Sequence, residues 1–204
     1  MKEKEQTGII PEGNGGKDIT VEVEQVQPDL QTAIIAFQKA KIRLLDVNRW
    51  DEFAGKIFAN FQLMDAEGQK RLGSVMRGDY IKIDILGPGS HSGDGNDWVF
   101  VEEMEASALE NGDFVGFRVR PISNPTKPDD DSVAHFYDRG STSSFTVTRT
   151  GEKVIVGIYD KNIEINTDSD LAVDNARNRL YGAIAKTFFS KVQWELLAEG
   201  ILRE

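Results

Sequence analysis

Apolar and polar residues alternate in many short segments of the chain, which predicts a protein rich in β-strands. Residues 19–26 place Ile19, Val21 and Val23 on one side, with acidic or hydroxyl side chains between them. Residues 79–86 repeat this pattern with isoleucines at every second position. A period of two is typical of a strand with one buried face. Further strands are predicted at 58–64, 97–104, 114–122, 133–137, 143–148 and 153–165.

Residues 30–54 follow the longer period of an α-helix. Apolar residues recur at helical spacing after Pro28, and they are Leu30, Ile34, Phe37 and Leu44. Proline suits the first turn of a helix, so a helix is predicted over residues 30–45. A short second helix is predicted at 48–54, where Asn48 can cap the first turn and Gly55 ends it.

The C-terminal region predicts the longest helix, which Asp168 or Asp174 can cap and which extends toward Leu202. Its apolar stripe consists of Leu180, Ile184, Phe188, Val192 and Leu196. Such a helix is roughly 40 Å long at a rise of about 1.5 Å per residue. Four further apolar residues lie off this stripe, namely Phe189, Trp194, Leu197 and Ile201. They require a second covering surface, which either a ligand cavity or a partner subunit would supply.

The order of these elements predicts an α+β fold. Consecutive strands form an antiparallel meander, and a long terminal helix with an apolar stripe covers the concave side of a curved sheet. We therefore expect a curved antiparallel β-sheet gripping a long C-terminal helix, with one or two helices after the first strand. Residues 1–18 are polar and glycine-rich and are predicted to be a disordered tail. Residues 19–204 are predicted to form a single α+β domain.

The element order over residues 19–203 resembles the START and Bet v 1-like superfamily. Trp50 in the second helix and the glycine-rich turns fall where that superfamily often has them. The resemblance implies a helix-grip fold with a hydrophobic cavity between sheet and helix. It also implies either binding of a hydrophobic or amphipathic small molecule or a polyketide cyclase-like or hydratase-like activity.

The composition excludes several classes of function. The 204 residues carry a formal net charge of −10, which disfavours binding to nucleic acid and to anionic membrane surfaces. No apolar run is long enough to insert into a membrane, and no secretory signal follows Met1. The chain has no cysteine, so it has no disulfide, thiol nucleophile or thiolate metal site. We expect a cytoplasmic protein.

Two pairs of residues are candidate ligand contacts. Arg118 and Arg120 alternate along a predicted strand, so their guanidinium groups share one face and can hold a carboxylate or phosphate. Alternatively, both lie on the outer face and pair with a neighbouring glutamate, Glu102, Glu103 or Glu105. His135 lies near Tyr137, and a histidine in such a setting can perform acid–base chemistry.

No metal or cofactor is predicted. The loop at 91–97 contains His91, Asp94 and Asp97, but its spacing does not match a calcium-binding loop. Three functions remain open. The first is a binding domain with an internal cavity whose polar anchors are Arg118, Arg120, His135 and Tyr137. The second is an assembly protein, such as a homodimer, with subunit contacts on the apolar helix. The third is a cyclase-like or hydratase-like enzyme that uses His135.

Overall fold

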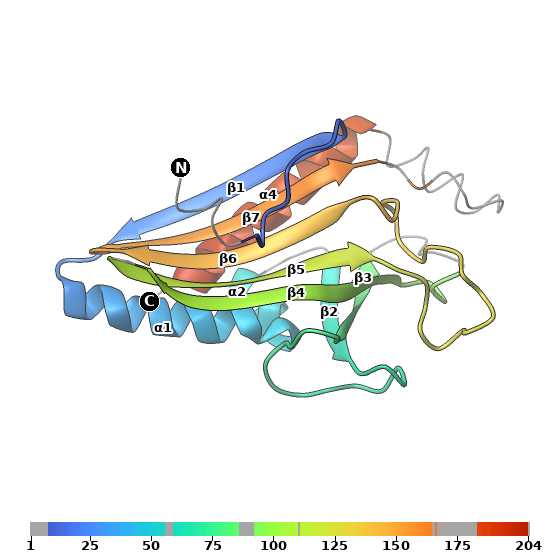
Figure 1. The fold of residues 1–204 in the computed structure, drawn as a ribbon, viewed down its shortest axis with the longest axis horizontal. Coiled ribbons are helices and arrows are strands. Elements are labelled where there is room, and N and C mark those ends of the chain that lie inside the picture. Colours follow the sequence, from blue (N-terminus) through green and yellow to red (C-terminus); the bar gives the residue numbers. More distant parts are fainter. Residues whose placement is uncertain are drawn as a thin grey trace.

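The computed structural model describes residues 8–55, 59–85, 92–109, 111–164, 166 and 183–203. Its strands and helices follow the predicted order (Figure 1). In chain order they are β1 (Lys17–Val26), α1 (Leu30–Leu45), a short 3₁₀ helix (Val47–Arg49), α2 (Trp50–Ala54), β2 (Ala59–Met64), β3 (Tyr80–Ile85), β4 (Asp97–Leu109), β5 (Gly112–Pro121), β6 (Thr142–Thr150), β7 (Lys153–Ile163) and α4 (Ala183–Leu202).

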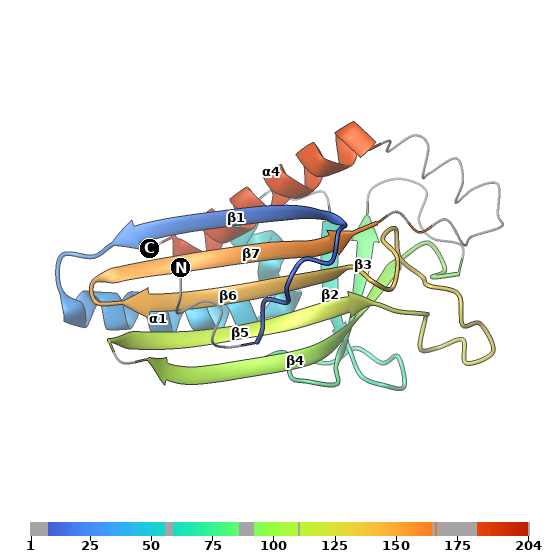
Figure 2. The same ribbon diagram turned by 45° about the horizontal axis from the view of Figure 1, so that its top comes forward.

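The seven strands form one antiparallel sheet in the order β1-β7-β6-β5-β4-β3-β2. Helices α1, α2 and α4 all lie on one side of it, which we call the inner face (Figure 2). The α+β fold class is therefore confirmed, with a C-terminal helix against an antiparallel sheet and two α-helices after the first strand. No helix in the described part of the chain is long and apolar enough to cross a membrane. Both predicted caps of the last helix, Asp168 and Asp174, lie outside the described residues.

Helix α1 packs on the inner face through small residues. Asp29 caps its first turn by accepting a hydrogen bond from the Thr32 backbone N–H at 2.7 Å. The buried stripe includes Ala33, Phe37, Ala40 and Leu44, which contact the core above β6 and β7. The predicted stripe was wrong in one member, because Leu30 is 51% exposed. The two alanines allow the helix backbone to approach the sheet, and Phe37 and Leu44 fill the space on either side of them.

Helix α4 packs on the inner face of the sheet beside α1 and α2. It contacts β1 and β7 on one side and α1 and α2 on the other. Leu197 and Ile201 are almost fully buried, and Trp194 packs against the same core. Among the described side chains of α4, the apolar residues off the main stripe are therefore covered by the chain itself. Phe189 lies outside the described side chains.

Gly200 allows α4 and α2 to approach each other closely. A Cβ atom at this position would lie 2.0 Å from the Phe53 carbonyl oxygen, which is a backbone atom and cannot rotate away. In a free helix, alanine would be favoured over glycine by about 1 kcal/mol. Here the clash dominates, because forcing extra atoms into a packed interface typically costs about 1–3 kcal/mol.

We therefore expect Gly200→Ala to lower the free energy of unfolding by about 2 kcal/mol, measured by urea denaturation. The control is Glu199→Ala, which changes an exposed neighbour on the same helix and should leave the urea midpoint unchanged. Equal or higher stability of Gly200→Ala would show that α2 and α4 are not in close contact.

The described part of the N-terminal segment lies across the outer face of the sheet (Figure 2). Ile9 is 2% exposed, and its carbonyl accepts a hydrogen bond from the Ser144 hydroxyl at 2.8 Å. The Gly8 carbonyl accepts another from Arg118 at 2.8 Å. Strand β1 begins at Lys17, two residues before the predicted start of the domain. An isoleucine within a polar, glycine-rich segment thus provides an apolar contact for the outer face.

Candidate ligand site beneath the C-terminal helix

Aromatic rings cover the middle of the inner face. They come from five elements and are Trp50, Phe61, Phe117, Phe145 and Trp194. The Phe145 ring centroid lies 4.9 Å from that of Trp50 and 5.3 Å from that of Trp194. These spacings are typical of favourable aromatic pairs. The indole N–H of Trp50 is satisfied by the Leu44 carbonyl at 3.1 Å. These five rings form one continuous cluster between the sheet and helices α2 and α4, which we call the aromatic wall.

Asp160 places a carboxylate at the edge of this wall. It continues the alternation of Val154, Val156 and Ile158 on β7, so its side chain points to the inner face, and it is 2% exposed. The indole N–H of Trp194 donates to Asp160 Oδ2 at 2.8 Å. The other oxygen, Oδ1, is buried and accepts no hydrogen bond from the described part of the chain. Such a group is unusual, because most buried polar atoms have a partner.

The burial of Asp160 changes its ionisation. Burial raises the pKa of Asp160 to about 6, and the hydroxyl of Ser143 and the indole of Trp194 oppose this rise only in part. Ser143 is the direct neighbour of Asp160 on β6. At neutral pH the carboxyl group is mostly ionised and poorly solvated. It is therefore well suited to accept a hydrogen bond from a ligand that carries an N–H or O–H group.

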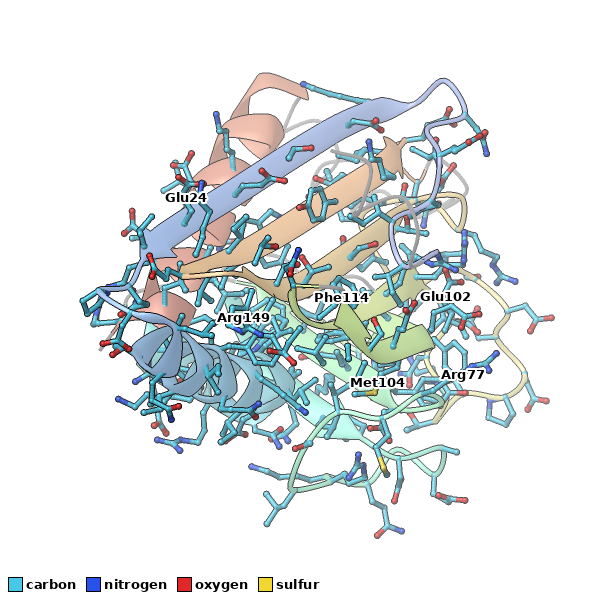
Figure 3. The ribbon with its side chains drawn as sticks, turned by 60° about the vertical axis from the view of Figure 1, so that its left-hand side comes forward. Glu24, Arg77, Glu102, Met104, Phe114 and Arg149 are labelled. Atoms are coloured by element: carbon cyan, nitrogen blue, oxygen red, sulfur yellow. The ribbon has the colours of Figure 1, made fainter. Side chains whose placement is uncertain are left out.

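Arg118 and Arg120 come together, but on the outer face. Their strand buries Val119 and Phe117 on the inner face, so the two guanidinium groups point to the other side. Both bind the carboxylate of Glu102, and Arg120 does so with Nε at 2.6 Å. Burial opposes ionisation of Glu102, but the two guanidinium groups outweigh it and hold its pKa below its usual range. Figure 3 shows Glu102 on the side of the sheet away from α1 and α4.

His135 and Tyr137 also lie together, in the loop between β5 and β6. Their ring centroids are 5.6 Å apart, and the Tyr137 backbone N–H donates to His135 Nδ1 at 2.9 Å. The ring proton of a neutral His135 therefore belongs on Nε2, which lies 4.0 Å from Asp97 Oδ2. Asn166 donates to the His135 carbonyl at 3.1 Å. Both ring nitrogens of His135 thus face groups of the chain itself.

The prediction of a strand at residues 133–137 was wrong. The segment forms an irregular loop, and only Tyr137 takes part in an isolated bridge. The backbone pairs with residues 164–166 through the Asp138 N–H to Glu164 carbonyl bond and the Asn166 N–H to Phe136 carbonyl bond. Side-chain contacts, including the Phe136 N–H to Asp97 bond at 3.1 Å, take the place of a regular ladder.

The described part of the loop at 91–97 is tied to other residues of the chain. Asp94 pairs with Lys127 at 2.5 Å, and His91 lies outside the described residues. Within the described ranges, no three histidine or acidic side chains gather closely enough to hold a metal ion.

Sequence reasoning missed Asp160. The signal was present, because a carboxylate follows three apolar residues at every second position of one strand. Continuing the period of two predicts a buried acid at that position. The partner, Trp194, comes from the last helix, and no local pattern links the two residues.

No protein-family model and no curated protein matches the sequence. Solved structures of similar fold include major latex-like protein 151 from Panax ginseng, with 10% identity and a TM-score of 0.41 over 86% of this chain and 97% of that one. Another is a truncated norcoclaurine synthase from Thalictrum flavum, with 10% identity and a TM-score of 0.40 over 90% and 94%. Both are Bet v 1-like, as the element order suggests. At these scores the similarity says nothing about the ligand or activity of this chain.

Proposed function

We propose that this chain binds a small molecule with an apolar body between the inner face of the sheet and α4, and that Asp160 is the polar anchor of the site. The observation that carries the proposal is the buried Oδ1 atom of Asp160, which accepts no hydrogen bond of regular geometry in the described part of the chain, although the Ser143 hydroxyl lies near the carboxylate. Leaving a buried acceptor unpaired typically costs about 1–3 kcal/mol. A ligand donor at this position would remove that penalty.

The surroundings of Asp160 define the class of ligand. The aromatic wall favours an apolar body, because ligand sites are mostly apolar with few polar groups that fix orientation. The ionised carboxylate favours a ligand that carries a hydrogen-bond donor. A protonated amine is the strongest such donor, because its hydrogen bond to the carboxylate is charge-assisted. An aromatic or aliphatic amine of low molecular weight therefore fits best.

The other two functions have less support. A cyclase-like or hydratase-like reaction would require His135 to exchange a proton with a substrate, and both of its ring nitrogens face Asp97 and Tyr137. A homodimer through α4 would require uncovered apolar residues on that helix. Leu197 and Ile201 are instead covered by α2 and the sheet.

The proposal is tested by calorimetric titration with two probes that share one ring. The first is 2-phenylethylamine, which carries a cationic donor, and the second is anisole, which has none. We expect the amine to bind at least about tenfold more tightly, because a hydrogen bond to a charged group contributes about 1.5–3 kcal/mol. Asp160→Asn should remove most of this preference.

The matched control is Glu24→Gln, which removes an exposed carboxylate from the outer face and should leave the affinity for the amine unchanged. Equal affinity of both probes would show that the cationic donor has no partner in the site, and equal loss in both variants would show that the amine binds the acidic surface in general. The interior site would then be rejected.

A further inference from the structure

A hollow lies where the C-terminal end of α4 meets α1 and the end of β1. Its volume is about 110 Å³, well below the roughly 300 Å³ at which pockets for drug-sized ligands begin. Ile35 of α1 and Leu202 of α4 line it, so part of its wall is apolar. We call this hollow the terminal groove.

All the charged residues that line the terminal groove are cationic. Lys39, Arg43 and Arg203 all line it, and no aspartate or glutamate does so among the described residues. This local excess occurs in a chain with a formal net charge of −10. Lys39 is exposed and has no acidic partner in the described part of the chain. The groove is therefore complementary in charge to an anion.

Arg43 is held in position by the end of α4. Its Nη1 atom donates to the carbonyls of Ile201, at 3.1 Å, and Arg203, and its guanidinium lies 5.8 Å from the Phe53 ring centroid. The last carbonyls of a helix carry partial negative charge, which would repel an anion. Arg43 offsets this charge, so the positive potential of Lys39 and Arg203 remains available to a ligand.

Gln27 adds a side-chain amide to the lining of the groove. Little of the residue is exposed, but its amide is not shut off from solvent, so water can satisfy it when no ligand is bound. Its backbone N–H donates to the Glu152 carbonyl at 2.9 Å, which fixes the residue at the end of β1. The amide N–H can donate a hydrogen bond to a ligand oxygen.

From these observations we propose that the terminal groove binds a short aliphatic carboxylate, with the carboxylate toward Lys39 and Gln27 and the alkyl chain against Ile35 and Leu202. The small volume limits the ligand to a head group and a few methylene groups. The site shares no residue with the interior site proposed for Asp160.

The proposal is tested with hexanoate as the probe, by following backbone amide signals in heteronuclear NMR spectra. We expect saturable shifts at Gln27, Lys39 and Leu202. Acetate lacks the chain and 1-hexanol lacks the charge, so each should bind at least about fivefold more weakly. Lys39→Gln should weaken hexanoate binding about fivefold, the factor that corresponds to about 1 kcal/mol for an exposed charge pair.

Two variants serve as controls. Lys41→Gln removes a charge from the same helix outside the groove and should leave the affinity for hexanoate unchanged. Asp160→Asn should also leave it unchanged, which separates this site from the interior one. Equal binding of hexanoate and 1-hexanol, or hexanoate binding that is insensitive to Lys39→Gln, would overturn the proposal. Binding to anionic phospholipid vesicles without binding of hexanoate would overturn it in favour of a membrane surface.

Discussion

Replacing Trp50 with alanine is expected to lower the free energy of unfolding by about 4 kcal/mol, since truncation of a buried tryptophan typically costs about 3–5 kcal/mol. Trp50 is 1% exposed and lies at the centre of the aromatic wall. Its ring is 5.1 Å from the Phe61 ring and 4.9 Å from the Phe145 ring. The truncation would leave a cavity where α2, α4 and the sheet meet.

Thermal and urea denaturation, followed by circular dichroism, measure this effect. For a chain of this length, the expected fall in Tm is about 10 °C. Trp50→Phe serves as the milder variant, because it keeps an aromatic ring and loses the hydrogen bond to the Leu44 carbonyl. It should lose less than half as much stability. A loss below about 1 kcal/mol for Trp50→Ala would contradict the placement of Trp50 in the core.

Asp160 is expected to make the folded chain less stable as the pH rises from 4 to 7. Its pKa in the folded state is raised to about 6, from a usual value near 4. Between these two values the folded state binds the proton more strongly than the unfolded state does. The contribution of Asp160 to the free energy of unfolding is therefore greatest below pH 4. It is lost as the pH rises through 6, and the total loss is about 3 kcal/mol.

The Asp160→Asn variant isolates this contribution. The amide keeps an oxygen that can accept the Trp194 hydrogen bond, and it has no charge to bury. Urea denaturation at several pH values measures the free energy of unfolding of the variant and of the unchanged protein. The difference between the two should grow from pH 4 to 7. Glu24→Gln is the control and should give a flat difference. A flat difference for Asp160→Asn as well would mean that Asp160 is solvated.

Much of the fold could be predicted from the sequence, because its strongest signals are local. The alternation in residues 19–26 and the helical spacing in residues 30–45 follow from the burial of one face of each element. The order of elements then leaves few ways to cover a curved antiparallel sheet. The structure confirms the first strand and the first helix to within two residues of their predicted bounds, whereas β4 runs to Leu109, five residues beyond its predicted end.

The errors lie where contacts between distant residues decide the structure. Residues 133–137 alternate like a strand, yet their backbone is held by Asp97 and by residues 164–166. Arg118 and Arg120 were correctly expected to share one face, but which face it is depends on the inward side chains of the same strand. Both guanidinium groups then bind Glu102, as the alternative interpretation of the pair supposed.

The candidate site was less accessible to sequence reasoning than the fold. Asp160 and Trp194 are 34 residues apart, and their hydrogen bond depends on how α4 crosses the sheet. The apolar residues off the main stripe of α4 suggested a ligand or a partner. The described ones, Trp194, Leu197 and Ile201, pack into the core of the chain itself, where Gly200 allows α4 to approach α2. Composition alone cannot show this contact.

The most direct test of an interior site anchored by Asp160 is the indole N–H resonance of Trp194 during titration with 2-phenylethylamine. This N–H donates to Asp160 at 2.8 Å, so a ligand at the carboxylate must change its environment. We expect a saturable shift of the Trp194 signal that is lost in Asp160→Asn, with the Trp98 signal unchanged in its separate cluster with Met64 and Ala134. An unchanged Trp194 signal at saturating amine would contradict the proposed site.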